Sequence, residues 1–537
     1  MFLYNWNSSS TLATFLATLI IAPIIAIFLS AFLGDTSLWP HLFSTVLPRY
    51  VYNTIVLMLG VGLLSLFFGI SSAWVVTRYN FFGKKIFEWA LLLPAAVPAY
   101  IIAYTYTDFL EYAGPVQGLL REIFNWNDSA DYWFPEIRSM SGAIVVMSCV
   151  LYPYIYMMTR ASFLTVPISF YQTSLIYGRN SFFSVALPLA RPGIFAGLAL
   201  VLMETISDFG TVEYFALETL TLGVFNVWLG MNSLSGAAQI SSVLFIFVVA
   251  LLTIEYLARR RQRFHEISSG QNMLESEILS NSKNFICFLI CITPILLGFI
   301  IPVLILLNFV FSGFSVINFQ EIFRTTFTSI SLAFFGALFV MLISFLMIVI
   351  SNYKSNNFQK ALIFVASCGY ALPGTILAVG IVIFVGWLNK IIHFHLSYVA
   401  GGFVVLIFAY TTRFLAVGNA AIRSGVLKIH PNAMDASATM GTGFFKSVRK
   451  IIMPLIFTNF LIGGILVFVD ILKELPITLL LRPFNFETLA TYVYQYASDE
   501  LLQESSFAAL IIIVASLGPV IFLNSTIQRV SQKKQSN

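Results

Sequence analysis

The chain carries twelve separate stretches of mainly apolar residues, and this feature limits the possible folds more than any other. About 20 residues of α-helix cross the roughly 30 Å hydrocarbon layer of a bilayer. Transmembrane β-strands would instead alternate in polarity over about 10 residues, and no such alternation occurs here. We therefore predict an all-α, polytopic membrane protein. The predicted spans are 12–33, 53–77, 86–107, 139–159, 192–212, 237–257, 285–311, 328–351, 361–388, 399–418, 454–474 and 507–526.

The composition supports this class. Hydrophobic residues make up 58% of the 537 residues and charged residues only 10%, with a mean hydropathy of +0.88, so polar side chains are too few to cover a soluble globule. The four cysteines all lie in predicted spans without a C-x-x-C pair, which favours buried thiols over redox or metal roles. They are Cys149, Cys287, Cys291 and Cys368.

Positive charge is distributed unevenly between the loops, and this predicts the orientation. Basic residues gather after the fourth and sixth spans, whereas loop 108–138 holds six acids against two arginines. By the positive-inside rule the basic loops are cytoplasmic, which also places both termini in the cytoplasm. The net charge of +5 therefore reflects orientation, and we expect membrane lipid and no nucleic acid as a partner. The basic residues are Arg160, Arg179, Arg191, Arg259, Arg260, Arg261 and Arg263, followed near the C-terminus by Arg529, Lys533 and Lys534.

The sequence repeats itself once. Pro98 and Pro373 lie in similar segments at an offset of 275 residues, and Pro188 and Pro454 do so at an offset of 266. The polar segment 258–284 has no counterpart and is predicted to be a cytoplasmic linker. We therefore predict a first six-span domain at 1–257 and a second at 285–537, arranged around a shared axis along the membrane normal.

A loop of the second half carries the most informative motif. Gly441 follows Asp435 by six positions, two small residues stand after the acid, and Pro454 follows Gly441 by thirteen. This pattern resembles the EAA loop of bacterial ATP-binding-cassette (ABC) importer permeases. The resemblance implies a short helix that docks into a groove of a cytosolic ATPase, with Ala436 and Ser437 allowing close approach. On its own, an acid followed by small residues is also typical of a solvated helix start.

The first half has a related loop at the equivalent place. It departs from the family pattern because Gln172 replaces the acid and Pro188 follows Gly178 by only ten positions, which leaves its register open by about one helical turn. The matching small positions are Thr173 and Ser174. We predict that both loops contact an ATPase.

Segments 185–215 and 466–500 resemble the fused two-domain permeases of ferric-iron ABC importers, as does the twelve-span layout. This resemblance implies the MetI-like fold of type I ABC importers in a bacterial inner membrane. It also implies two copies of a cytosolic ABC ATPase and a periplasmic or lipid-anchored ferric-ion-binding protein. The chain itself would bind no cofactor, since ATP and magnesium belong to the ATPase. Fused thiamine permeases share the layout, so thiamine or another small solute stays an alternative.

Four acids lie in or at the end of the fifth span of each half: Glu204, Asp208, Asp470 and Glu474. Carboxylates at membrane depth usually face a wet cavity or a partner. One interpretation is a ring of acids that lines the pathway and favours a hard cation such as Fe(III). The other is structural, because Lys473 stands beside two of them and helix ends tolerate charge.

No catalytic or metal-binding motif is present. His393 and His395 lack a third ligand nearby in sequence, and GTGFFKS at 441–447 lacks the glycine that a phosphate-binding loop needs before its lysine. The sequence therefore predicts a permease that is not an enzyme and takes its energy from a partner. An ion-gradient-driven secondary transporter, with the fifth-span acids as the ion site, is the alternative.

Overall fold

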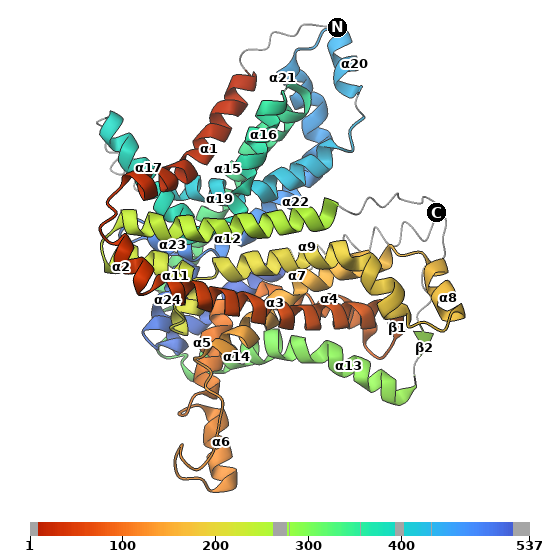
Figure 1. The fold of residues 1–537 in the computed structure, drawn as a ribbon, viewed down its shortest axis with the longest axis vertical. Helices are drawn as coiled ribbons and strands as arrows, with labels where there is room; N and C mark the ends of the chain where they lie inside the picture. Colours follow the sequence, from red (N-terminus) through yellow and green to blue (C-terminus); the bar gives the residue numbers. More distant parts are fainter. Residues whose placement is uncertain are drawn as a thin grey trace. The chain divides into compact units, whose positions relative to one another are not determined.

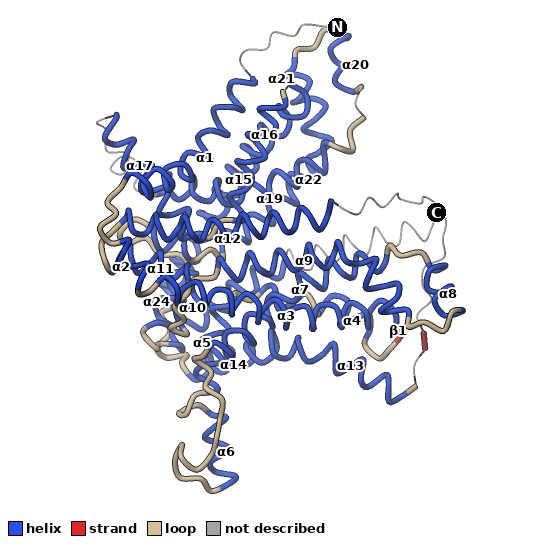
Figure 2. Tube along the Cα trace, in the orientation of Figure 1, coloured by secondary structure: helices blue, strands red, loops and turns tan. Residues whose placement is uncertain are grey.

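A computed structural model describes residues 9–260, 277–278, 280–354, 356–392, 402–430 and 432–518. Helices form most of this described part of the chain (Figure 1, Figure 2). Its strands are two residues long, β1 (Tyr79–Asn80) and β2 (Glu277–Ile278), and they pair in parallel. The all-α prediction is confirmed.

Ten helices in the described residues are long and apolar enough to cross a membrane. An eleventh span would be a bent pair, Lys84–Ala96 with Ala99–Phe124, and the last predicted span falls on a shorter apolar helix, Leu502–Gly518. The ten are Thr11–Leu33, Leu47–Arg78, Met140–Leu164, Phe182–Ser207, Leu234–Thr253, Asn281–Ser312, Phe319–Tyr353, Gly374–Ile391, Phe403–Val426 and Phe444–Leu472.

The third span of each half is broken at the same point of the repeat. In the first half, α4 (Lys84–Ala90) is followed by a 3-10 turn, η1 (Leu93–Ala96), and by α5 (Ala99–Leu110). In the second half, α16 (Asn357–Ala366) is followed by η5 (Ser367–Ala371) and by α17 (Gly374–Ile392). Pro98 and Pro373 stand just before α5 and α17, because a proline without an N–H group ends the preceding helix and starts the next.

The chain divides into two compact units. The α3 unit comprises Thr45–Leu222, Leu244–Asn318 and Val493–Asn537. Its centre is α3 (Leu47–Arg78), α7 (Met140–Leu164) and α9 (Leu187–Ser207). The first span of the second half, formed by α13 (Asn281–Ile295), η4 (Leu296–Ile300) and α14 (Ile301–Ser312), belongs to this unit, and Cys287 and Cys291 are buried in its core.

The α15 unit comprises Met1–Ser44, Gly223–Val243 and Phe319–Tyr492. Its centre is α15 (Phe319–Lys354), α19 (Phe403–Val426) and α22 (Met453–Leu472). The first span of the chain, α1 (Ser9–Leu33), packs here, with Ala13 and Ala17 against Met347 and Ile363. The predicted boundaries 1–257 and 285–537 therefore mark the sequence repeat, whereas each compact unit holds the first span of the other half. Most of the predicted linker, 261–276 and 279, lies outside the described residues.

Buried hydrogen bonds between equivalent residues tie each half together. Thr54 Oγ1 accepts a bond from Leu220 N at 3.0 Å, and Ser329 Oγ accepts one from Leu489 N at 2.7 Å. The other helices are α2 (Trp39–Ser44), α6 (Pro115–Phe124), α8 (Ile168–Ile176), η2 (Phe182–Ala186), α10 (Gly210–Tyr214), α11 (Leu220–Phe225), η3 (Asn226–Gly230), α12 (Leu234–Arg260), α20 (Ala433–Thr439), α21 (Phe444–Ser447), η6 (Val448–Ile452), α23 (Pro476–Leu481) and α24 (Leu489–Ser498).

Candidate functional site

The second-half loop forms a short helix with one outward face. Asp435 lies in the first turn of α20, where a negative charge favours the helix N-terminus. Asp435 and Ala436 are exposed, whereas Ser437 is buried. Small and acidic side chains therefore face outward, and the third motif residue points inward.

A left-handed glycine ends this helix. Gly441 has φ +76°, a conformation that costs other residues about 1 to 2 kcal/mol. The turn allows Thr442 N to donate to Ser437 O at 3.2 Å, which is the terminal bond of a Schellman motif. The Ser437 hydroxyl also bonds to that of Ser447 at 2.7 Å and so ties α20 to α21.

The first-half loop repeats this geometry. Gly178, with φ +64°, lies just after the end of α8, and Arg179 N donates to Ser174 O at 2.9 Å. The hydroxyls of Ser174 and Ser181 bond at 2.6 Å, as those of Ser437 and Ser447 do. Gln172 and Thr173 thus occupy the exposed places of Asp435 and Ala436. The glycine-to-proline spacing is three residues shorter in the first half, and this difference lies after Gly178. The residues before the two glycines therefore match one to one, which resolves the register of the first loop.

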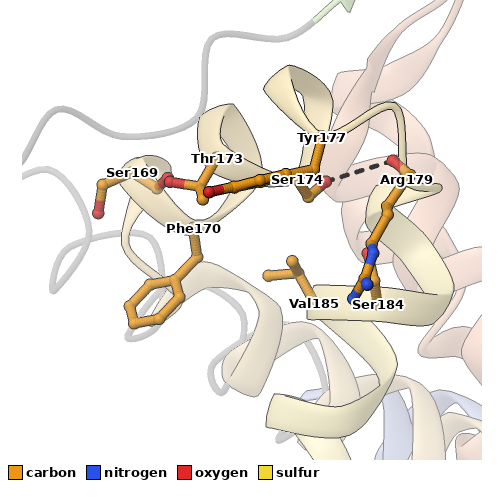
Figure 3. Close-up of a pocket in the computed structure, with 8 residues that line it drawn as sticks. All are labelled: Ser169, Phe170, Thr173, Ser174, Tyr177, Arg179, Ser184 and Val185. Atoms are coloured by element: carbon orange, nitrogen blue, oxygen red, sulfur yellow. Dashed lines mark hydrogen bonds between the residues drawn. The ribbon is translucent and has the colours of Figure 1, made fainter.

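A surface pocket of about 450 Å³ opens beside α8 (Figure 3). Phe170 and Tyr177 give it apolar walls, while Arg179 supplies the charge. Such a hollow can receive a side chain that protrudes from a partner protein. Its lining residues are Ser169, Phe170, Thr173, Ser174, Tyr177, Arg179, Ser184 and Val185.

Each loop leads into its span through one π-helical turn. The turns η2 and η6 lie at the same offset as Pro188 and Pro454, which stand at the start of α9 and α22. A π-turn accommodates one extra residue and is often found at functional sites. Loop, π-turn and proline therefore form one duplicated element.

Two of the four predicted pathway acids cap short helices. Asp208 Oδ1 accepts bonds from Thr211 N at 2.9 Å and Val212 N at 3.2 Å, so it caps α10. Glu474, at the equivalent position, accepts a bond from Ile477 N at 3.2 Å and caps α23. The carboxylates at these positions end the fifth span and start the next short helix.

Glu474 also has a charged partner that the sequence reasoning missed. Arg413 Nη1 lies 3.4 Å from Glu474 Oε1, and the two side chains are only 10% and 5% exposed. A Cβ at Gly374 would collide with both groups, so a glycine at the start of α17 makes room for the pair. The available signal was a lone arginine inside the predicted span 399–418.

The other two acids are less enclosed. Asp470 pairs with Lys473 at 3.3 Å, both about one-quarter exposed, as the structural interpretation expected. Glu204 is half-buried in α9, one turn before Asp208. Within the described residues no group of three or more His, Cys, Asp or Glu could hold a metal ion. His393 and His395 lie outside the described residues.

The sequence is similar to known transport proteins. Residues 65–263 match the family described as binding-protein-dependent transport system inner membrane component. The chain is 24% identical over 495 residues to the Fe(3+)-transport system permease protein FbpB 2 of Haemophilus influenzae, covering 90% of each chain. It is 20% identical to the ferric transport system permease protein FbpB of Actinobacillus pleuropneumoniae, covering 94% of this chain and 76% of that one.

A shorter relative matches only part of the chain. The molybdenum transport system permease protein ModB of Escherichia coli strain K12 is 26% identical over 208 residues. These residues are 87% of that protein but 37% of this chain. This proportion fits a chain built from two permease-like halves.

Proposed function

We propose that this chain is an inner membrane component of a binding-protein-dependent transport system and, more specifically, the fused, two-half permease of a ferric-iron ABC importer. The observation that carries the proposal is the duplicated loop element, joined to a likeness to ferric permeases along nearly the whole chain. A soluble binding protein would deliver the iron, and both termini would lie in the cytoplasm. We assign no ATP hydrolysis to this chain.

The loops suit a mechanical role. Helices α8 and α20 are short, have exposed outer faces and are fixed to their spans by serine hydroxyl pairs. A displacement of α8 would therefore also move α9, and a displacement of α20 would also move α22, because each pair is connected through a π-turn and not through a flexible loop. Two copies of a cytosolic ATPase, one on each loop, would couple hydrolysis to alternating access.

Reconstitution tests the proposal. The chain is placed in liposomes with its neighbouring ATPase and ferric-loaded binding protein, and ⁵⁵Fe uptake is measured. We expect uptake to require ATP and both partners and to survive a protonophore. The proposal is overturned if the chain alone accumulates iron against a gradient, or if the full system carries thiamine and no iron.

Glu204 and Asp470, which are equivalent in the repeat, stay the candidates for contact with the cation, because the other two acids, Asp208 and Glu474, have capping roles. We expect Glu204→Ala combined with Asp470→Ala to reduce ⁵⁵Fe uptake at least tenfold while the ATPase still co-purifies. The control is Lys473→Ala, which removes the partner of Asp470 and leaves the acid in place. Normal uptake in the double variant would exclude the pathway role.

A further inference from the structure

The third span of the first half continues into an arm that leaves the α3 unit. After Pro98 the chain bends by 89°, and Ala99–Phe124 then runs sideways to the preceding segment. Helix α5 is buried inside the α3 unit, whereas α6 leaves it (Figure 1). We call residues 111–138, which contain α6 and the chain returning from it, the lateral arm.

The lateral arm is held together by its own contacts. Gln117 Nε2 donates to Leu110 O at 2.7 Å, and the Tyr132 hydroxyl donates to Gln117 Oε1 at 2.6 Å. Trp126 stacks between Phe124 and Tyr132, with ring centroids 4.8 and 4.7 Å away. Its two ends meet in an ion pair, Arg138 Nε to Glu111 Oε1, at 2.5 Å. These internal contacts give the lateral arm a defined conformation and a defined surface.

That surface exposes several large apolar side chains. Leu119, Ile123, Phe124 and Trp133 are 58%, 60%, 57% and 86% exposed. Leu119 and Ile123 lie four residues apart on α6 and so share one helix face, Phe124 lies at the edge of that face, and Gln117 is buried. Leaving such side chains in water costs about 25 cal/mol for each Å² of apolar surface.

We propose that the lateral arm lies in the headgroup region of the bilayer, as an interfacial anchor in the leaflet farther from α8. An amphipathic helix that leaves a membrane bundle sideways lies along the interface plane, where tryptophan and tyrosine are enriched. Helix α14 packs against α5, the helix from which the arm leaves, and it also exposes large apolar side chains, Leu304 and Phe311. The inference rests on insertion in a membrane and is independent of the transported substrate.

The net charge of the lateral arm indicates which kind of lipid headgroup it can bind. Residues 111–138 hold five acids and two arginines, so electrostatic attraction to anionic lipid would not drive the contact. Apolar burial and the aromatic side chains would drive it instead. The anchor should therefore form equally well in zwitterionic phosphatidylcholine.

Site-directed spin labelling tests the anchor in the full chain. Ile123→Cys and, as the matched control, Glu122→Cys are labelled and reconstituted in phosphatidylcholine vesicles. The ratio of oxygen accessibility to nickel-chelate accessibility is then measured for each label. The signal of the parent chain, which lacks the added cysteine, is subtracted as background. We expect a ratio several-fold higher at position 123 than at 122, because oxygen concentrates in lipid and the nickel chelate in water.

Two results would overturn the anchor. One is equal, water-like accessibility at both positions. The other is a label at 123 that becomes shielded only when the binding protein is added, which would make the arm a protein-docking surface. ⁵⁵Fe uptake is measured on vesicles of the same lipid that also hold the ATPase, ATP and the ferric-loaded binding protein. Lipid contact without uptake would count against the importer proposal alone, and uptake without lipid contact would count against the anchor alone.

Discussion

Replacing Ala436 with arginine is expected to abolish iron uptake while the helices stay folded. Ala436 is exposed on α20, so the new side chain has room in the isolated permease. In a close-packed interface with an ATPase the same side chain would be forced out of water without a partner. We expect a loss of about 2 kcal/mol or more, which corresponds to roughly 30-fold weaker ATPase binding. Co-purification of the ATPase and ATP-driven uptake measure the effect.

The equivalent change in the first loop gives the matched comparison. Thr173→Arg occupies the same place on α8, and Asn127→Arg adds the same charge at an exposed site in the lateral arm. We expect Thr173→Arg to weaken ATPase binding too and Asn127→Arg to leave it unchanged. An Ala436→Arg variant that retains its ATPase and its uptake would exclude α20 as a docking helix.

Breaking the buried pair between Arg413 and Glu474 is expected to destabilise the α15 unit strongly. Arg413→Met removes the cation and leaves the Glu474 carboxylate enclosed without its charge partner. Loss of one member of a buried pair costs about 3 to 5 kcal/mol. Thermal unfolding in detergent, followed by tryptophan fluorescence, should show a markedly lower midpoint.

A second substitution should restore most of this loss. Glu474→Gln removes the charge but keeps an oxygen that can accept the bond from Ile477 N. We therefore expect Arg413→Met with Glu474→Gln to approach the parent stability, because buried pairs are often replaceable by neutral groups. Lys473→Ala breaks a more exposed pair and should cost at most about 1 kcal/mol. A single Arg413→Met variant as stable as Lys473→Ala would contradict this assignment.

The spans and the repeat could be predicted from sequence because both depend on local pattern. Apolar length identifies a span, and the offsets of Pro98 and Pro188 to their counterparts match the structural breaks and π-turns. The exchange of first spans could not be predicted in this way. An apolar helix face such as that of α1 specifies burial, but it does not specify which half of the chain will cover it.

The candidate site was predicted in part. The motif around Asp435 predicted a short helix broken at Gly441, which the structure contains, and its docking role stays a prediction. The acids were harder to interpret, because sequence spacing does not show that the chain after α9 and α22 forms the short helices α10 and α23. Only with those helices in place are Asp208 and Glu474 recognisable as caps.

The paired π-turns set the rotational phase of each fifth span. One extra residue in an α-helix advances every later side chain by about 100° around the helix axis. Removing one residue from η6 would convert it to regular α-helix. Asp470 would then rotate by about 100° around the axis of α22, while α20 would stay unchanged. The same holds for η2 and Glu204, so in each half the π-turn fixes the angle around the helix axis between the loop helix and the carboxylate far along the span.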